Sequence, residues 1–336
     1  MDEHEPDSKD AAALVGGFSG PRVRVGISAC LVGHHVRYDG RDKRADALVE
    51  RLGPHVEFVP VCPEVEVGMS VPREPIELIR TGPGIRLLGV TSGVDHTDEM
   101  RAFAARRLSE LAVCGYIFKS RSPSCGVDST PVFDRDGQTE ERGPGMFAAA
   151  LMARFPDMPV SEDEPLCEPA SLAHFVDRIR AHARLQTLFT QPLTAGRLVA
   201  FHTREKLLLM AHDQPAYREL GPLVARASEL CQRADTRAEL AATYRQRLTR
   251  ALANPASPGG HVNAMQHAAG YFKKCLDDEA RAALTRTITG YGAGALQRAA
   301  PLQLLRRHAV AHDVAYLLEQ SYFLAHGVEL VGGARS

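Results

Sequence analysis

The chain has 336 residues, of which 44% are hydrophobic and 24% charged, and its formal net charge at pH 7 is −1. This length allows two domains, each with its own core, and the composition is ordinary for a globular protein. No apolar run has the length of a membrane span, and the acidic start MDEHEPDSKD is unlike a signal peptide. We therefore expect a cytoplasmic protein without a membrane partner, and a disordered tail over residues 1–20.

The first part of the chain, residues 21–167, alternates between strand-like and helix-like segments. Strands alternating with helices indicate βαβ units, so we predict an α/β domain with an open, mostly parallel, Rossmann-like sheet. We expect Thr97 to be the N-cap of the second helix. Short apolar runs predict strands at 23–28, 57–61, 85–90, 114–120 and 158–161, and helical periodicity predicts helices at 45–53, 96–112 and 145–155.

The second part of the chain is helical. The cluster SEDEPLCEP at 161–169 ends the alternation of strands and helices, and almost every segment after Ser171 has apolar residues at helical spacing. We predict an all-α domain over 171–330. Its expected helices are 171–189, 192–213, 215–234, 236–253, 261–275, 277–292 and 301–325.

The two halves differ in charge. Residues 185–336 hold 18 Lys+Arg and 12 Asp+Glu, a net of about +6, whereas the first 184 residues have a net of about −7. A basic half suggests a polyanionic partner, although on charge alone an ordinary solvated surface is the simpler explanation of so modest an excess.

Three of the seven cysteines follow predicted strands. Cys30 comes after the first strand, Cys62 after the second, and Cys125 after the strand at 114–120. Ligand sites of open parallel sheets form at the carboxyl ends of strands, so these thiols can converge although they are distant in sequence. The other four lack this placement, and we expect Cys114, Cys231 and Cys275 to be small buried side chains.

Three converging thiols allow several kinds of chemistry. Zinc would take a fourth ligand such as His34 or His35 and form a structural site. A 4Fe-4S cluster held by three thiolates would keep one open iron. Alternatively, Cys125 is a nucleophile with a histidine as its base. The spacing does not decide among these three.

Polar residues beside these cysteines are candidates for the same site. Glu64 could act as a general base, and Ser122 or Ser124 could bind substrate or relay a proton. Equally, Glu64 could be a solvated acid and the serines could cap a turn. Arg73 and Lys119 could hold an anionic group.

Four sequence blocks resemble the thiouracil desulfidase (TudS) family. They are SACLVGHHVRYDG, PVCPEVEVGMSVPREPIEL, FKSRSPSCG and GPGMFAAALMARFPDMPVSEDEPL. The resemblance implies that Cys30, Cys62 and Cys125 bind a 4Fe-4S cluster whose open iron takes the sulfur of a thiocarbonyl substrate. It also implies Glu64 as the catalytic acid/base and Ser122 as the assisting serine.

The helical half is similar to a domain often fused to this desulfidase domain. The similar segments are 198–221, 263–274 and 316–323, and AHGVEL at 325–330 departs from the expected proline-rich ending. The fused form resembles RudS-type desulfidases, which implies tRNA as partner and 4-thiouridine as target. Candidate RNA contacts are His202, Arg204, Lys206 and Lys273; the alternative is that the histidine packs between helices and that the lysines are solvated.

We therefore expect a desulfidase that hydrolyses C=S to C=O in the 4-thiouridine of tRNA and releases hydrosulfide without a redox step. One alternative is a desulfidase of free thiouracil or thiouridine nucleotides. A second alternative is a zinc-stabilised RNA-binding module without catalysis. The sequence does not indicate the oligomeric state.

Overall fold

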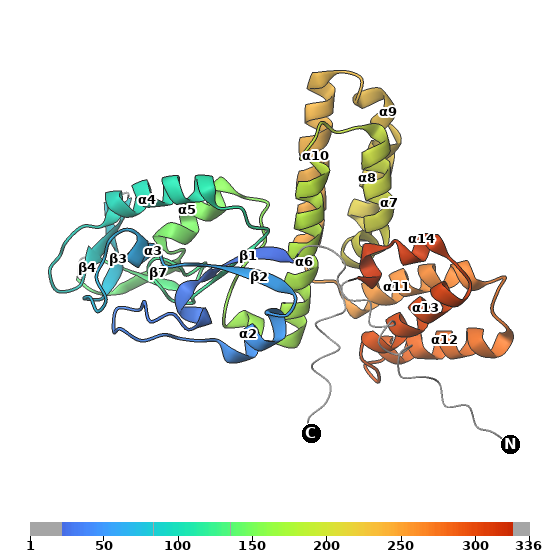
Figure 1. Ribbon diagram of the computed structural model, residues 1–336, viewed down its shortest axis with the longest axis horizontal. Coiled ribbons are helices and arrows are strands. Elements are labelled where there is room, and N and C mark those ends of the chain that lie inside the picture. The colour runs from blue at the N-terminus through green and yellow to red at the C-terminus, as the bar shows by residue number, and fades with distance from the viewer. Residues whose placement is uncertain (1–21, 83, 135, 325–336) are drawn as a thin grey trace.

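The computed structural model describes residues 22–324, except 83 and 135. An α/β part and a helical part lie side by side, as Figure 1 shows. The predicted disordered tail, 1–20, lies outside the described residues, as does AHGVEL. The predicted class, a mostly parallel α/β sheet followed by an all-α region, is confirmed.

The first sheet is entirely parallel, in the order β2-β1-β5-β8. The central strand β1 is VRVGIS. Val23, Val25 and Ile27 point to one face and are buried, and Gly26 and Ser28 on the opposite face are buried as well. Gly26 allows β5 to approach, since a Cβ at this position would lie 2.2 Å from the Tyr116 ring. The strands are β1 (Val23–Ser28), β2 (Val56–Val61), β5 (Tyr116–Phe118) and β8 (Val160–Glu162).

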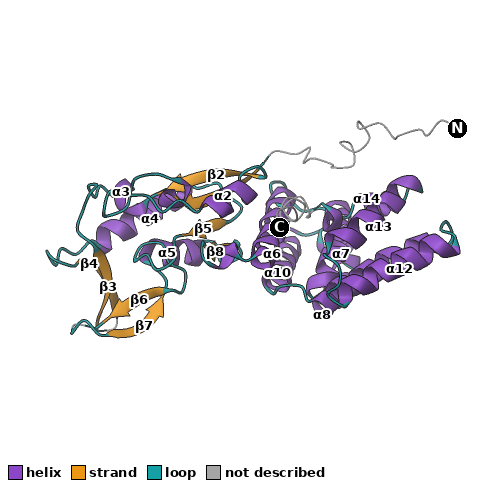
Figure 2. Ribbon diagram, turned by 90° about the horizontal axis from the view of Figure 1, so that it is seen from below, coloured by secondary structure: helices purple, strands orange, loops and turns teal. Residues whose placement is uncertain are grey.

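A second sheet, with the order β4-β3-β6-β7, extends from the first and is seen in Figure 2. The prediction that 85–90 belongs to the parallel sheet is wrong, because this strand forms an antiparallel hairpin with its neighbour β3. Strands β3, β6 and β7 were not predicted from the sequence. The strands are β3 (Ile76–Thr81), β4 (Gly84–Gly89), β6 (Thr130–Phe133) and β7 (Thr139–Gly143).

The helices of the α/β part lie near their predicted positions, but the predicted N-cap is wrong. Thr97 is the first residue of its helix and is fully buried, and its hydroxyl accepts a hydrogen bond from the Leu87 N–H at 2.9 Å. Asp95 instead accepts from the Thr97 N–H. The helices are η1 (Ala29–Val32), α2 (Asp46–Leu52), α3 (Pro63–Glu66), α4 (Thr97–Glu110), α5 (Met146–Arg154) and η2 (Pro165–Cys167).

The remaining described residues are mostly helical, with more breaks than expected. The segment 215–234 divides at Arg226. The segment 301–325 divides at Asp313, whose φ is +49°, and again between Leu318 and Ser321. Within the described residues, no helix has the length and apolarity that crossing a membrane needs. The helices are α6 (Pro169–Leu188), α7 (Ala195–His212), α8 (Gln214–Ala225), α9 (Ala227–Leu230), α10 (Ala234–Ala253), α11 (Pro258–Ala269), η3 (Gly270–Phe272), α12 (Asp278–Gly292), α13 (Ala299–Ala311), α14 (Ala315–Leu318) and η4 (Ser321–Phe323).

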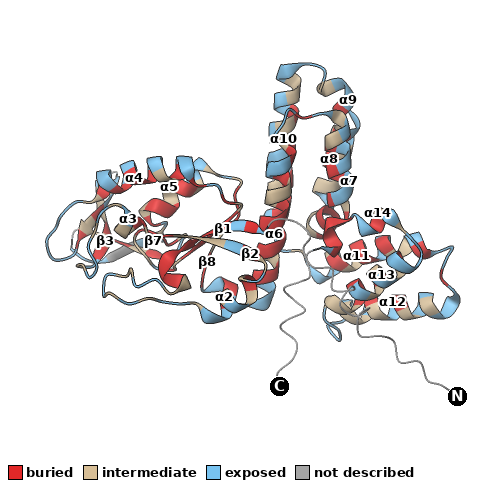
Figure 3. Cartoon of the chain, viewed as in Figure 1, coloured by how far each residue is buried: buried red, intermediate tan, exposed pale blue. Residues whose placement is uncertain are grey.

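Helix α6 joins the two parts because it contributes to both cores. Leu172, Phe175 and Ile179 pack in the cluster that includes β1 and α2. Further along the same helix, Leu185 and Leu188 pack in the core of the helical part. Figure 3 shows this helix buried between the sheet and the remaining helices. The α/β core therefore extends beyond the predicted boundary at 167.

Candidate active site

Cys30, Cys62 and Cys125 line one cavity of about 350 Å³ at the carboxyl ends of β1, β2 and β5. Cys30 lies in η1 directly after β1, and Cys62 precedes α3 directly after β2. Cys125 lies in the loop between β5 and β6. The βα connections of the parallel sheet thus bring together three thiols that are far apart in sequence.

The other four cysteines do not line this cavity. Cys114 is half-buried, and its thiol donates to Oε1 of Gln186 at 3.2 Å. Cys231 is half-buried and packs against the core of the helical part, whereas Cys275 is exposed, so the expectation of a buried thiol is wrong for Cys275. Both follow the last turn of a short helix, where the backbone turns at the surface. Cys167 is exposed as well.

The cavity thiols are held in their neutral form. Burial, with a smaller contribution from Cys62, raises the pKa of Cys30 to about 11. Burial likewise raises the pKa of Cys62 and of Cys125, although the Ser28 hydroxyl partly opposes this for Cys125. A metal must therefore displace the thiol protons when it binds here.

Glu64 lies in the first turn of α3, two residues after Cys62, and its carboxylate is held from two sides. The Arg73 guanidinium donates to Oε2 through Nε at 3.0 Å and also through Nη2. The Ser124 hydroxyl donates to Oε1 at 2.9 Å. The side chains of Arg73 and Glu64 are only 7% and 14% exposed, so this is a largely desolvated ion pair.

Arg73 also holds the loop that follows Cys30. Its Nη2 donates to the Val36 carbonyl at 2.9 Å, and its backbone N–H donates to the Tyr38 carbonyl at 2.9 Å. The Cys62 thiol lies 3.8 Å from the same Val36 oxygen. From the sequence, Arg73 was expected only to hold an anionic group, because the sequence carries no signal that it would pair with Glu64.

Ser122 lines the cavity, and its hydroxyl caps the turn that presents Cys125. Its Oγ accepts from the backbone N–H groups of Ser124 at 3.3 Å and Cys125 at 3.1 Å. Gly145 allows this turn to pack closely, since a Cβ there would lie 2.5 Å from the Ser124 carbonyl carbon. In this loop, Ser124 contacts Glu64 and Ser122 shapes the backbone.

Lys119 faces the cavity but is already paired. Its ammonium lies 3.2 and 3.0 Å from the two carboxylate oxygens of Asp163. Burial opposes ionisation of Asp163, yet hydrogen bonds from Ser120 and the charge of Lys119 hold its pKa below the usual value. Lys119 and Arg73, both expected to hold an anion, are thus neutralised by carboxylates of the chain itself.

The histidines expected to complete a zinc site lie elsewhere. His34 and His35 are exposed and do not line the cavity, and His35 lies 3.7 Å from Asp42. Among the described residues, no three His, Cys, Asp or Glu side chains are placed to hold a single metal ion.

The four RNA-contact candidates differ in exposure. Arg204 and Lys273 are exposed, and Lys206 is half-buried with its ammonium 5.7 Å from the Tyr217 ring centroid. His202 is buried, and its Nδ1 lies 3.1 Å from the Tyr244 hydroxyl. His202 therefore packs between helices and does not face a nucleic acid.

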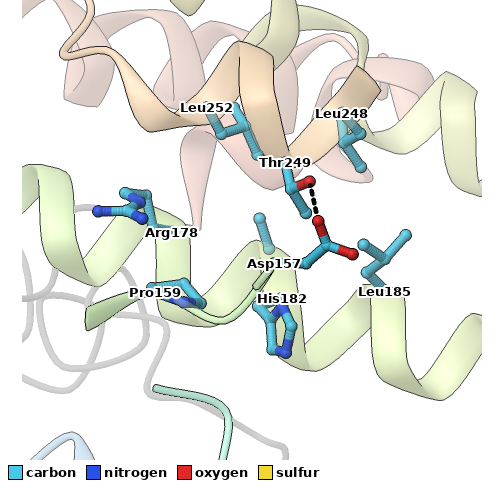
Figure 4. Close-up of a pocket in the computed structure, with 9 residues that line it drawn as sticks. Asp157, Pro159, Arg178, His182, Leu185, Leu248, Thr249 and Leu252 are labelled. Carbon is cyan, nitrogen blue, oxygen red and sulfur yellow. Dashed lines mark hydrogen bonds between the residues drawn. The ribbon is translucent and has the colours of Figure 1, made fainter. Parts of the chain in front are cut away.

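A second, much smaller cavity lies where α6 meets α10 and the segment before β8, as Figure 4 shows. Its volume is about 20 Å³, which is room for about one water molecule. The Thr249 hydroxyl donates to Asp157 at 3.2 Å across it. This cavity is too small for a substrate, so the cysteine-lined cavity is the candidate active site.

The fold and this cavity define an α/β enzyme with a cysteine-lined site at the carboxyl ends of parallel strands. Residues 25–163 match the 2-thiouracil desulfurase family, and residues 206–327 match a family described as protein of unknown function DUF1722. The chain belongs to the 2-thiouracil desulfurase family, fused to a DUF1722 domain. It is therefore a desulfidase, as the resemblance implied.

The chain is also similar to individual proteins. The chain is 36% identical over 146 residues to the uncharacterized protein YbgA of Escherichia coli, covering 44% of this chain and 84% of that protein. It is 37% identical over 109 residues to the uncharacterized protein YbbK of Bacillus subtilis, covering 30% and 71% respectively. A solved structure of the 4Fe-4S-dependent thiouracil desulfidase TudS is 29% identical, covering 44% of this chain and 94% of that one, with a TM-score of 0.34.

Proposed function

We propose that this enzyme removes sulfur from 4-thiouridine in tRNA, and that Cys30, Cys62 and Cys125 hold a 4Fe-4S cluster. The observation that carries the proposal is the convergence of these three thiols with Glu64 in one cavity. The overall reaction converts C=S and water into C=O, hydrosulfide and a proton. No electron is gained or lost.

The donor set of the cavity fits an iron–sulfur cluster. Thiolates are the ligands that such clusters prefer, and these three come from separate loops around one cavity. When bound through three cysteines, the cluster supplies a Lewis-acidic iron that attracts a soft sulfur atom. Zinc is less well supported, because neither His34 nor His35 lies at the cavity to complete its coordination.

Glu64 is the base in this proposal. Its carboxylate accepts a proton from the water that adds to the ring carbon of the thiopyrimidine, and the C–S bond then breaks to release hydrosulfide. Arg73 and the Ser124 hydroxyl hold the carboxylate in one orientation, so it does not need to reorient when water attacks.

A tRNA substrate is supported by cavity size and charge. A cavity of about 350 Å³ admits a single base and not a duplex, so the target base must leave its stack. The helical half carries the positive excess of about +6, and phosphate neutralisation is the dominant source of RNA affinity. Arg204, Lys206 and Lys273 are the proposed phosphate contacts.

Free thiopyrimidines are the second candidate substrates. All residues that line the cavity lie between Ser28 and Glu164, so the α/β part holds the reacting groups without the helical domain. The helical domain would then serve another purpose, such as covering the site.

The two candidates separate in one experiment. Protein purified without oxygen is incubated with tRNA containing 4-thiouridine and, at equal concentration, with free 4-thiouracil, and the products are analysed by chromatography. The proposal predicts uridine and an equal amount of hydrosulfide from tRNA, with a higher kcat/KM than for the free base. Unchanged 4-thiouridine with an intact cluster would falsify the proposal.

A further inference from the structure

Tyr116 is a fully buried side chain of the core that also contains Cys125. It lies on β5, is 0% exposed and does not line the cysteine-lined cavity. Its ring stacks on Phe118 with 4.1 Å between the centroids and contacts Phe147 edge-on at 6.1 Å. These two rings hold the Tyr116 ring in one orientation, and they thereby fix the position of its hydroxyl oxygen.

The Tyr116 ring extends from β5 across β1, on the face that α4 and α5 cover. Gly26 on β1 pairs with Tyr116, and a Cβ at Gly26 would lie 2.2 Å from the ring. The strand order is β2-β1-β5, so a ring that covers β1 directs its hydroxyl towards the β2 side of the sheet. Cys62 lies on that side, directly after β2.

The ionisable groups around the hydroxyl agree with this direction. Burial raises the pKa of Tyr116 well above its usual value, and Cys125, Glu66 and Cys62 raise it further. Arg107 opposes them. Both carboxylate oxygens of Glu66 already accept hydrogen bonds, Oε1 from the Cys62 backbone N–H at 3.1 Å and Oε2 from Arg107 at 3.1 Å. The remaining acceptors near the hydroxyl are therefore the cysteine sulfurs.

The Tyr116 hydroxyl has no hydrogen-bond partner among the residues that the structure describes. A buried hydroxyl without a partner destabilises the folded chain, so native proteins rarely keep one that no ion, water or ligand completes. Phe118 and Phe147 pack in the same core, and a phenylalanine at position 116 would fill the same space without that cost. The hydroxyl therefore indicates an acceptor that a neutral thiol does not provide.

We propose that the Tyr116 hydroxyl donates a hydrogen bond to the metal-bound sulfur of Cys125 and thereby stabilises the cluster. This inference rests on the proposed cluster site and makes Tyr116 a positioning residue. A neutral thiol accepts hydrogen bonds only weakly, whereas a metal-bound thiolate keeps negative charge and accepts them well. Hydrogen bonds of this kind hold metal ligands in place and help to set the reduction potential of an iron–sulfur cluster.

The test is Tyr116→Phe in the cluster-loaded full chain, because phenylalanine keeps the ring and removes only the hydroxyl. The reduction potential of the cluster is expected to fall, since the hydroxyl no longer stabilises the added negative charge of the reduced cluster. Iron is expected to pass to a chelator about tenfold faster, the usual cost of losing an outer hydrogen bond at a metal site. Tyr244→Phe is the matched control, because Tyr244 is equally buried and its hydroxyl contacts His202, within the helical part.

The outcomes separate this inference from the proposed function. A lower potential in Tyr116→Phe and not in Tyr244→Phe supports the inference, and failure of Tyr116→Phe alone to retain a cluster is the extreme of the same effect. A wild-type potential in Tyr116→Phe overturns the inference and leaves the desulfidase function standing, even if both variants release iron faster through a general loss of stability. A wild-type chain that takes up no iron overturns the proposed cluster and the inference together.

Discussion

The Ser124 hydroxyl donates a hydrogen bond to Oε1 of Glu64 over 2.9 Å, although 60 positions of sequence separate the two residues. Ser124 is fully buried, and it lies beside Cys125 in the loop after β5. The carboxylate therefore depends on the loop that carries the third cysteine. A change in this loop alters the base as well as the metal site.

Ser124→Ala is predicted to lower kcat about tenfold, because Glu64 loses one of the two groups that orient it. The three cysteines remain, so we expect iron and sulfide content to stay at the wild-type value. Steady-state kinetics with metal analysis of the same sample measures both. Ser109→Ala, an exposed serine on α4, is the control, and loss of the cluster in Ser124→Ala would show that the residue acts on the metal site instead.

Arg73→Ala is predicted to lower the free energy of unfolding by about 3–5 kcal/mol, because it leaves the Glu64 carboxylate buried without its cation. Urea denaturation measures this loss. In a Glu64→Gln background the same substitution is expected to cost less, since no buried charge is then left unpaired. Equal costs in the two backgrounds would mean that Arg73 stabilises the chain mainly through the Val36 and Ser70 carbonyls.

Acid is predicted to destabilise the junction of the two parts. Burial lowers the pKa of His182 from 6.5 to about 4, so the unfolded chain binds a proton between these values that the folded chain does not. The contribution of neutral His182 to the free energy of unfolding is fully present above pH 6.5. It is lost as the pH falls from 6.5 to about 4, and the total loss is about 3 kcal/mol.

Melting temperatures between pH 4 and pH 7 test this dependence. His182→Asn removes the titrating ring and should flatten the curve, whereas His312→Asn, at an exposed position, should leave it unchanged. A curve of the same slope in His182→Asn would assign the acid sensitivity to other groups, such as His174 and His212, whose pKa values burial also lowers.

We predict that truncating the chain before α6 prevents the α/β part from folding, whereas truncating it after α6 does not. A chain ending at Glu168 loses Leu172, Phe175, Val176 and Ile179 from the core beside β1, at about 1.5–3 kcal/mol each, which is comparable to the stability of a whole domain. A chain ending at Thr190 keeps them. We expect only the longer chain to unfold cooperatively, to act on free 4-thiouracil and to lose activity on tRNA. Full activity of the longer chain on tRNA would show that the helical domain takes no part in substrate recognition.

The sequence predicted the parallel sheet well because its strands are strongly apolar. β1 was predicted at its observed bounds, and the thiols that follow β1, β2 and β5 could be expected at one edge. The second sheet was missed because short strands such as β6 and β7 mix polar and apolar residues and depend on pairing with distant segments.

The contacts within the site could not be predicted from local patterns. Residue type made Glu64 a candidate base, but neither the Ser124 hydrogen bond nor the Arg73 ion pair has a signature in the spacing of residues. His202 illustrates the opposite error, since a basic segment suggested a surface and the histidine packs against Tyr244. Which residues of α7 are exposed depends on which of its faces the other helices cover.

Metal content is the most direct test of the central claim, that Cys30, Cys62 and Cys125 hold one iron–sulfur cluster beside Glu64. Protein prepared without oxygen is analysed for iron, acid-labile sulfide and zinc, together with its visible absorption spectrum. The account predicts about four iron and four sulfide per chain, a brown colour, and loss of both in any one of the three Cys→Ala variants, while Cys275→Ala keeps them. A colourless chain with about one zinc and no sulfide would contradict it.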